Sequence, residues 1–317
     1  IRTMSIDGKS IGTNNGDWWS RFTLTTSGLM ISNIAQDIKN NERTIRKTWD
    51  EFRAALSSGT FSYDNIEEAK KCTFLKVYND LFHDNFGIEH STIKLTDLDG
   101  TQVGRGCVLK KDEAPDYERF IPKKEFITAD NRFSPPGVEW LYLALGNETA
   151  IHQCAQAECR THVGDEFGFC HFKFDDAFAD IKLVDLTIAD NKTYEQLNQV
   201  LETYAQKQVK RGIKAAKALG RIPKYNVNKA EFKRLFTEWA VYTYSKLLSE
   251  QIFEPIDDSA DKGTMYAPFQ TMAQYYSSLG YSGIIYGSTV SEIGRNIVLF
   301  NKNIAKPCGA IEKYTIL

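Results

Sequence analysis

The stretch from Asn131 to Ile151 reads NRFSPPGVEWLYLALGNETAI, and its character changes twice along its length. It opens with a Pro-Pro-Gly sequence, which is typical of a turn. A short apolar run, Trp140–Leu145, follows and predicts a strand because it is aromatic and aliphatic throughout. The polar residues after it, with Glu148 in what would be the first turn, predict the start of a helix. Turn, strand and helix therefore succeed one another here.

Similar strand-like runs occur elsewhere in the second half of the chain, and helical segments separate them. Predicted strands lie at 140–145, 167–174, 181–186, 283–286 and 297–300. The spacing of apolar residues predicts helices at about 41–57, 65–84, 193–204, 228–239 and 268–279. Strands interrupted by a helical block favour an α+β fold over a doubly wound parallel sheet.

The chain is expected to form two domains, as its length of 317 residues suggests. Residues 1–112 are predicted to form an N-terminal, mainly helical accessory domain. A polar segment at 111–117 containing Pro115 marks the expected boundary. Residues 113–317 form the second domain, with a helical insert at about 190–262. The helices of 1–112 could cover the second domain, bind a partner or form a homodimer.

Composition excludes several classes of protein. Lys and Arg number 39 against 41 Asp and Glu, so the net charge of −2 disfavours nucleic-acid binding through a broad basic face. No apolar run approaches the roughly 18 residues that span a bilayer, so we expect no membrane partner. We expect no signal peptide, and the six Cys show no Cys-x-x-Cys spacing. A cytoplasmic protein with reduced thiols is therefore predicted.

Two clusters of residues admit more than one interpretation. Soft potential zinc ligands gather within twenty residues: His152, Cys154, Cys159, His162, Cys170 and His171. Their spacing fits no strong zinc template, so we expect no metal and favour buried or half-buried side chains. A basic run follows later in the chain: Lys207, Lys210, Arg211, Lys214, Lys217, Arg221 and Lys224. It favours a solvated helix face, with a patch for an acidic partner as the alternative.

The stretch at 131–151 has counterparts far downstream. Tyr266 and Gln270 come first, then Gly280-Tyr-Ser-Gly-Ile-Ile-Tyr-Gly-Ser288, then Gly294-x-Asn296-x-Val-Leu-Phe300. This two-part pattern resembles the RES-domain family, the toxin half of RES–Xre toxin–antitoxin modules. The resemblance covers about residues 113–317, and the two blocks occur in the correct order.

The resemblance implies a compact domain similar to ADP-ribosyltransferases. It implies a toxin that takes NAD+ as its substrate and cleaves the nicotinamide–ribose bond, as a glycohydrolase or a phosphorylase. It also implies an Xre-type antitoxin as a protein partner. The acceptor of the ADP-ribose, whether water, phosphate or a protein side chain, stays open, and so does the oligomeric state.

Cleavage of an N-glycosidic bond passes through an oxocarbenium-like transition state, which makes definite demands on a site. Cations must hold the pyrophosphate, and the resemblance implies Arg132 and Arg119 for this role. Tyr142 and Ser288 match the family's strand-end Tyr and its Ser, and would contact the nicotinamide ribose. Alternatively, each of these four is a surface, core or turn residue. Tyr266, Gln270 and Asn296 are expected to be structural.

The acid required by this chemistry has two candidate positions. Counting from the family's Thr-Ala-Ile-x-Glu pattern gives Gln153, whereas Glu158-Cys-Arg-Thr-His-Val-Gly164 matches a second family feature. Five residues turn a helix by about 500°, so the two side chains face about 140° apart. Three interpretations are open. Glu158 is the acid, or Gln153 is an engineered substitution of the family's Glu, or the protein is a weakly active natural variant. The spacing from Tyr142 favours position 153.

Two rival functions accompany this hypothesis. One is a mono-ADP-ribosyltransferase that modifies a protein target, and the other is a catalytically weak NAD-binding module in which Gln153 is native. A zinc-dependent hydrolase is a third, remote alternative.

Overall fold

The computed structural model describes residues 31–84, 87–221, 228–253, 261–288 and 294–317. By its internal contacts the chain divides into two units. The first comprises residues 1–52, 70–90 and 189–247, and the second comprises residues 53–69, 91–188 and 248–317. No helix in the described ranges is long and apolar enough to cross a membrane.

The first unit is built on helices whose long members are α1 (Ile31–Ser57), α5 (Tyr194–Leu219) and α6 (Lys229–Phe253), with the short α3 (Thr73–Asn79) among them. Its centre is aromatic. Trp49, Phe74, Tyr78 and Tyr244 are buried and make edge and stacked ring contacts at centroid distances of 5.0 to 6.1 Å. Such ring pairs add to the burial of large apolar surfaces, which stabilises the helices.

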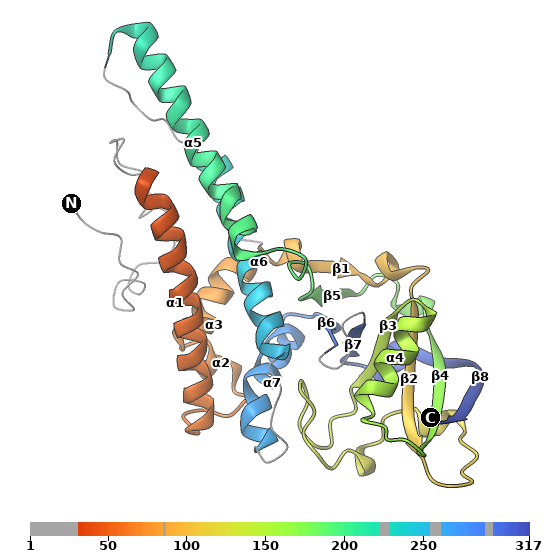
Figure 1. Ribbon diagram of the computed structural model, residues 1–317. Coiled ribbons are helices and arrows are strands. Elements are labelled where there is room, and N and C mark those ends of the chain that lie inside the picture. The colour runs from red at the N-terminus through yellow and green to blue at the C-terminus, as the bar shows by residue number, and fades with distance from the viewer. Residues whose placement is uncertain (1–30, 85–86, 222–227, 254–260, 289–293) are drawn as a thin grey trace. The chain divides into compact units, whose positions relative to one another are not determined.

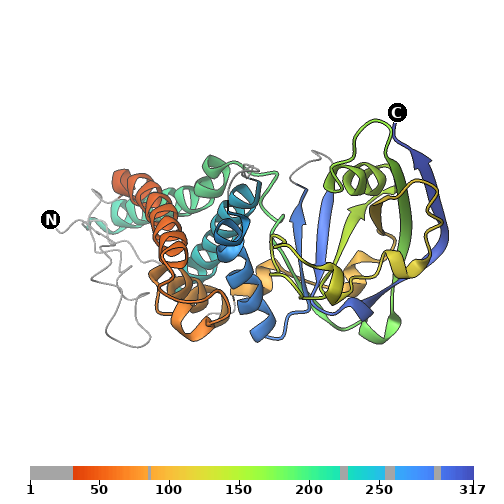
Figure 2. The same cartoon turned by 90° about the horizontal axis from the view of Figure 1, so that it is seen from below.

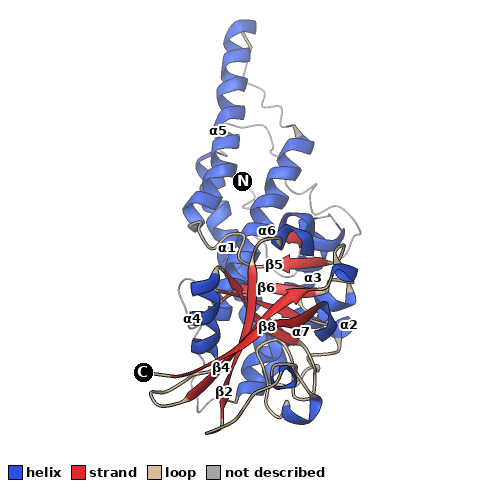
Figure 3. Ribbon diagram, turned by 90° about the vertical axis from the view of Figure 1, so that its right-hand side faces the viewer, coloured by secondary structure: helices blue, strands red, loops and turns tan. Residues whose placement is uncertain are grey.

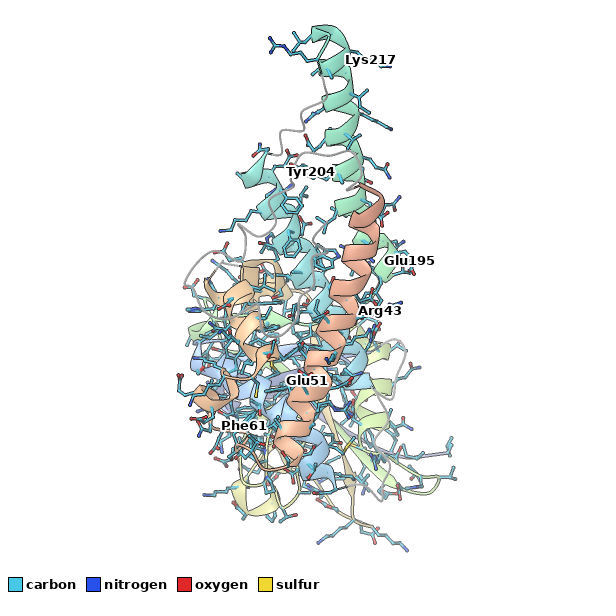
Figure 4. All side chains as sticks on the ribbon, turned by 90° about the vertical axis from the view of Figure 1, so that its left-hand side faces the viewer. Arg43, Glu51, Phe61, Glu195, Tyr204 and Lys217 are labelled. Carbon is cyan, nitrogen blue, oxygen red and sulfur yellow. The ribbon has the colours of Figure 1, made fainter. Side chains whose placement is uncertain are left out.

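Helix α5 begins and ends at the signals that the sequence carries. Thr193 and Gln196 form a capping box at its start, and the left-handed Gly220 (φ 58°) ends the helix. Glu195 lies near its start and Lys217 near its end (Figure 4). The basic side chains of 207–221 on this helix are exposed, as a solvated face requires.

The second unit is an eight-stranded mixed sheet with the order β1-β5-β6-β7-β3-β2-β4-β8. The strands are β1 (Thr92–Lys94), β2 (Gln102–Leu109), β3 (Leu141–Gly146), β4 (Glu166–Phe174), β5 (Lys182–Asp185), β6 (Gly283–Gly287), β7 (Arg295–Leu299) and β8 (Ala305–Thr315). The β5–β6 pair is parallel, and the other neighbours run antiparallel. The strands turn progressively across a strongly twisted sheet (Figure 3).

Helix α4 (Glu148–Glu158) packs on one face of this sheet, beside β2 and β3 (Figures 1 and 2). Its Ile151, Cys154 and Ala155 are buried with Phe167 and Phe169 of β4. The absence of a side chain at Gly104 makes room for this layer, because a Cβ there would lie 2.2 Å from the Phe169 ring. The opposite face carries a larger aliphatic cluster that includes Leu143 and Ile297.

The same unit contains the short α2 (Ile66–Ala69) and α7 (Lys262–Ser278), which lie against each other. Pro268 lies inside α7 and is buried.

The structure confirms the α+β class, and the five predicted strands appear as β3 to β7 within two residues at each end. Strands β1, β2 and β8 were not predicted. The division into units also differs from the expected boundary at 112–113, because β1 and β2 pair with strands of the second half and belong to the same sheet. The predicted helical insert groups instead with the first helices.

Candidate functional site

Three polar residues from distant parts of the chain meet at the end of α4. Glu158, in the last turn of the helix, accepts a hydrogen bond of 2.6 Å from Asn296 Nδ2 and one of 3.3 Å from Ser288 Oγ. Ser288 directly follows β6 and Asn296 lies in β7, and both are almost fully buried. The Glu158 side chain itself is exposed. A solvent-accessible carboxylate thus accepts hydrogen bonds from two buried side chains, Ser288 and Asn296.

Cys154 fixes the orientation of the Asn296 side chain. Its thiol lies 3.1 Å from Asn296 Oδ1, so the amide oxygen faces the S–H and the amide nitrogen faces Glu158. Cys154 and Glu158 share one face of α4 because they are four residues apart. Burial raises the pKa of the Cys154 thiol to about 11, so it stays protonated and serves as a donor at neutral pH.

An aromatic group adjoins these residues on the same sheet face. Tyr142 of β3 pairs its hydroxyl with Ser134 Oγ at 2.9 Å, and Tyr286 of β6 packs edge-on against Phe133 at 4.8 Å. Burial raises the pKa of Tyr286 well above its ordinary value, and the nearby Glu158 and Tyr142 raise it further. The Tyr286 hydroxyl therefore stays protonated at neutral pH.

Arg132 adjoins the aromatic group, and its charge opposes the rise in the Tyr286 pKa. The guanidinium donates to the backbone carbonyl of Ile252 and lies over the Tyr266 ring, 5.4 Å from its centroid. Gln270, one turn further along α7, is buried and donates to Asp130 Oδ1 at 3.0 Å. Tyr266 and Gln270 thus hold the loop that carries Arg132.

A second cation, which the sequence did not single out, is Arg105 of β2. Its Nη1 atom is buried and has no hydrogen-bond partner among the described residues. Burial lowers its pKa, whereas the neighbouring Cys159, Cys107 and Tyr142 act in the opposite direction. A buried guanidinium without a partner is costly to keep, so it is well suited to receive an anionic ligand. The strand that carries it was not predicted, which is why it was missed.

Two of the predicted site residues are exposed and are not among the hydrogen-bond partners of Glu158, although Arg119 is an electrostatic neighbour of Arg105. Arg119 is exposed, paired with Glu113 at 3.0 Å, and donates to the backbone carbonyl of Val108. Gln153 is exposed on α4 and makes no hydrogen bond to a described residue. The structure therefore brings together Arg132, Tyr142, Glu158 and Ser288, and Arg105 is linked to them through its electrostatic interaction with Tyr142.

The Cys and His residues of 152–171 do not form a single group. Cys154 contacts Asn296, and Cys170 is buried in the cluster on the opposite face of the sheet. His162 is exposed beside Asp165. His152 and His171 lie together near the start of α4, with no Cys beside them in the described part of the chain.

Comparison with known proteins gives one structural similarity. No family model matches the chain, and no curated protein matches it. Among solved structures, a chain of the "M. tuberculosis MbcT-MbcA toxin-antitoxin complex" is similar, with 10% sequence identity and a TM-score of 0.35. The similarity covers 73% of this chain and 91% of that chain. At this TM-score it carries no functional inference, and the site stands on its own geometry.

Proposed function

We propose that this protein binds NAD+ and cleaves its nicotinamide–ribose bond, as a toxin of the RES type. The observation that carries the proposal is the exposed Glu158 carboxylate held by buried Ser288 and Asn296, with Tyr142 and Tyr286 beside it. Glu158 takes the role of the acid, in place of position 153.

Each group has a definite task in this reaction. Positive charge develops on the ribose as nicotinamide departs, and the Glu158 carboxylate stabilises it. Ser288 and Asn296 hold the carboxylate in one orientation, so it needs little reorganisation in the transition state. The Tyr142 and Tyr286 rings supply flat apolar surfaces for the nicotinamide or the ribose.

The pyrophosphate is assigned to the two arginines. Arg132 presents a planar guanidinium that is held at its Nη1 by the Ile252 carbonyl. Arg105 offers the buried Nη1 that lacks a partner. Arg105 has Tyr142 as an electrostatic neighbour and Arg132 has Tyr286, which supports the assignment of the pyrophosphate to these two arginines.

A protein antitoxin belongs to the same proposal. The resemblance to the RES family implies an Xre-type partner. The exposed basic face of α5 offers a surface for an acidic partner. A cytoplasmic location would place the protein with its substrate.

Incubation of the purified protein with NAD+ tests the proposal directly. We expect nicotinamide release in proportion to protein concentration, measured by chromatography, and release of ADP-ribose or its phosphorylated form. A Gln153→Glu variant is assayed in parallel. Absence of NAD+ loss with both proteins would overturn the enzymatic function. Radiolabel from NAD+ on protein would instead identify a mono-ADP-ribosyltransferase, and calorimetric binding without turnover would identify a binding module.

Replacement of Arg105 by methionine should separate ligand binding from folding. The Kd for NAD+ is expected to rise about 10-fold, because one charge-assisted phosphate contact is lost. The urea midpoint of unfolding should not fall, since the methionine removes a buried charge whose Nη1 lacks a partner. Arg119→Met is the matched control, because Arg119 is exposed and already paired. Equal loss of NAD+ affinity in both variants would contradict the assignment.

A further inference from the structure

Four metal-ligand side chains converge near the start of α4, apart from the proposed NAD+ site. Glu148 and His152 come from the first two turns of the helix, His171 from β4 and Glu312 from β8. One ligand atom of each lies within 4.8 Å of all the others. The two imidazoles are about three-quarters buried, with side-chain exposures of 22% and 25%.

The distances among these atoms match the edges of a small tetrahedron. His152 Nε2 lies 3.1 Å from Glu148 Oε1 and 3.7 Å from Glu312 Oε1. His171 Nε2 lies 3.3 Å and 3.4 Å from the same two oxygens. Tetrahedral zinc with bonds of about 2.0–2.2 Å places its ligand atoms about 3.3–3.5 Å apart. The four nitrogen-to-oxygen edges therefore lie close to the values that a bound zinc ion requires.

With neutral imidazoles, hydrogen bonds alone do not satisfy this arrangement. Each neutral imidazole carries at most one N–H at Nε2, yet each Nε2 faces two carboxylate oxygens. The two glutamates also bring two negative charges into one place, which is unfavourable without a cation between them. A divalent ion at the centre would coordinate all four ligand atoms and neutralise the two carboxylate charges.

The surrounding structure holds the ligands on rigid elements. Glu148 and His152 are four residues apart on α4, whose start is capped by Asn147. The Phe169 ring stacks on His152 at 3.8 Å and meets His171 edge-on at 5.1 Å, so one buried ring orients both imidazoles. The pairing of β4 with β8 changes register between Phe169 and His171, and the extra residues lie in β8, between Cys308 and Glu312.

We propose that Glu148, His152, His171 and Glu312 form a structural zinc site that joins α4 to β4 and β8. Two imidazole nitrogens favour zinc over the oxygen-seeking Mg²⁺ and Ca²⁺. Four protein ligands make the site closed, which is typical of a structural and not a catalytic zinc. The proposal is independent of the function assigned to Glu158.

Metal binding to the full chain tests this site without any activity assay. Protein stripped with a chelator and dialysed is titrated with Zn²⁺, and bound metal is measured by mass spectrometry. We expect one zinc per chain, with a Kd below about 1 µM. Co²⁺ in place of Zn²⁺ should give the strong visible absorption of a tetrahedral ion. Zinc should also raise the thermal midpoint of unfolding.

Conservative variants decide whether these side chains are the ligands. His171→Gln and Glu312→Gln should each raise the Kd for Zn²⁺ by about 100-fold or more. His162→Gln is the matched control, because that side chain is exposed and remote from the cluster, and it should bind zinc as the parent does. Circular dichroism of the metal-free variants establishes that each is folded. Failure of the folded parent to bind zinc, or undiminished binding by both ligand variants, would overturn the proposal.

Discussion

Replacing Glu158 by glutamine is expected to lower the rate of nicotinamide release by about 10²–10³-fold, the effect of removing one well-placed electrostatic contact. The amide keeps the size of the carboxylate and can still accept from Asn296 or Ser288. It lacks the negative charge that opposes the developing positive charge on the ribose. The KM for NAD+ should change by less than about 3-fold, since binding by the arginines is retained. Steady-state assays of kcat and KM measure both quantities.

The control for this experiment lies on the same helix. Gln153→Ala alters an exposed side chain that makes no hydrogen bond to a described residue, so kcat should stay within about 2-fold of the parent value. A large loss of kcat in Gln153→Ala with little change in Glu158→Gln would show that position 153 takes the catalytic role. In that outcome Gln153→Glu should be faster than the parent protein, and Glu158→Gln should be nearly unchanged.

Replacing Gly283 by alanine is expected to destabilise the sheet unit by about 3 kcal/mol. A Cβ at this position would lie 2.4 Å from the backbone oxygen of Val298 and 3.1 Å from Leu183 Cδ2. The oxygen belongs to the adjacent strand β7, so it cannot move without breaking the pairing of β6 and β7. The urea midpoint, followed by circular dichroism, measures the loss.

Gly263→Ala provides the comparison for the Gly283 variant. Its Cβ would meet the side-chain oxygens of Asp130 and Asp261 at 3.3 and 3.5 Å, and these can rotate away. The site lies in the first turn of α7, where alanine is a better helix former than glycine. We expect a change in unfolding free energy of less than about 1 kcal/mol. Equal destabilisation by both substitutions would contradict the close backbone approach at Gly283.

Local patterns in the sequence were sufficient to predict the strands and helices in the central part of the fold. Trp140–Leu145 has the apolar composition of a strand buried on both faces, and Thr193 and Gln196 form a capping box that depends on four adjacent residues alone. Strand β2 escaped prediction because Gly104 and Gly106 lower its strand propensity. Those glycines are required by the rings packed on them, which is a property of the tertiary structure.

The candidate site was predictable only in part for a related reason. Tyr142, Ser288 and Arg132 were found from their order along the chain, and the structure brings them near one another. The choice between Gln153 and Glu158 depended on which face of α4 meets β7, and sequence spacing cannot supply that. Arg105 lies among glycines and apolar residues in Gly104-Arg-Gly-Cys-Val-Leu109. A charged residue is unusual in such a segment, and this could have marked Arg105 as a candidate.

Ser288 and Asn296, which donate hydrogen bonds to Glu158, are synthesised long after it, and this has a consequence during translation. The helix that bears Glu158 lies near the middle of the chain, whereas Ser288 directly follows β6 and Asn296 lies in β7, the last strand but one. A nascent chain that has not passed position 288 therefore lacks both donors, and one that has not passed position 296 still lacks Asn296 and most of β7. The proposed activity therefore requires synthesis beyond position 296, close to the end of the chain.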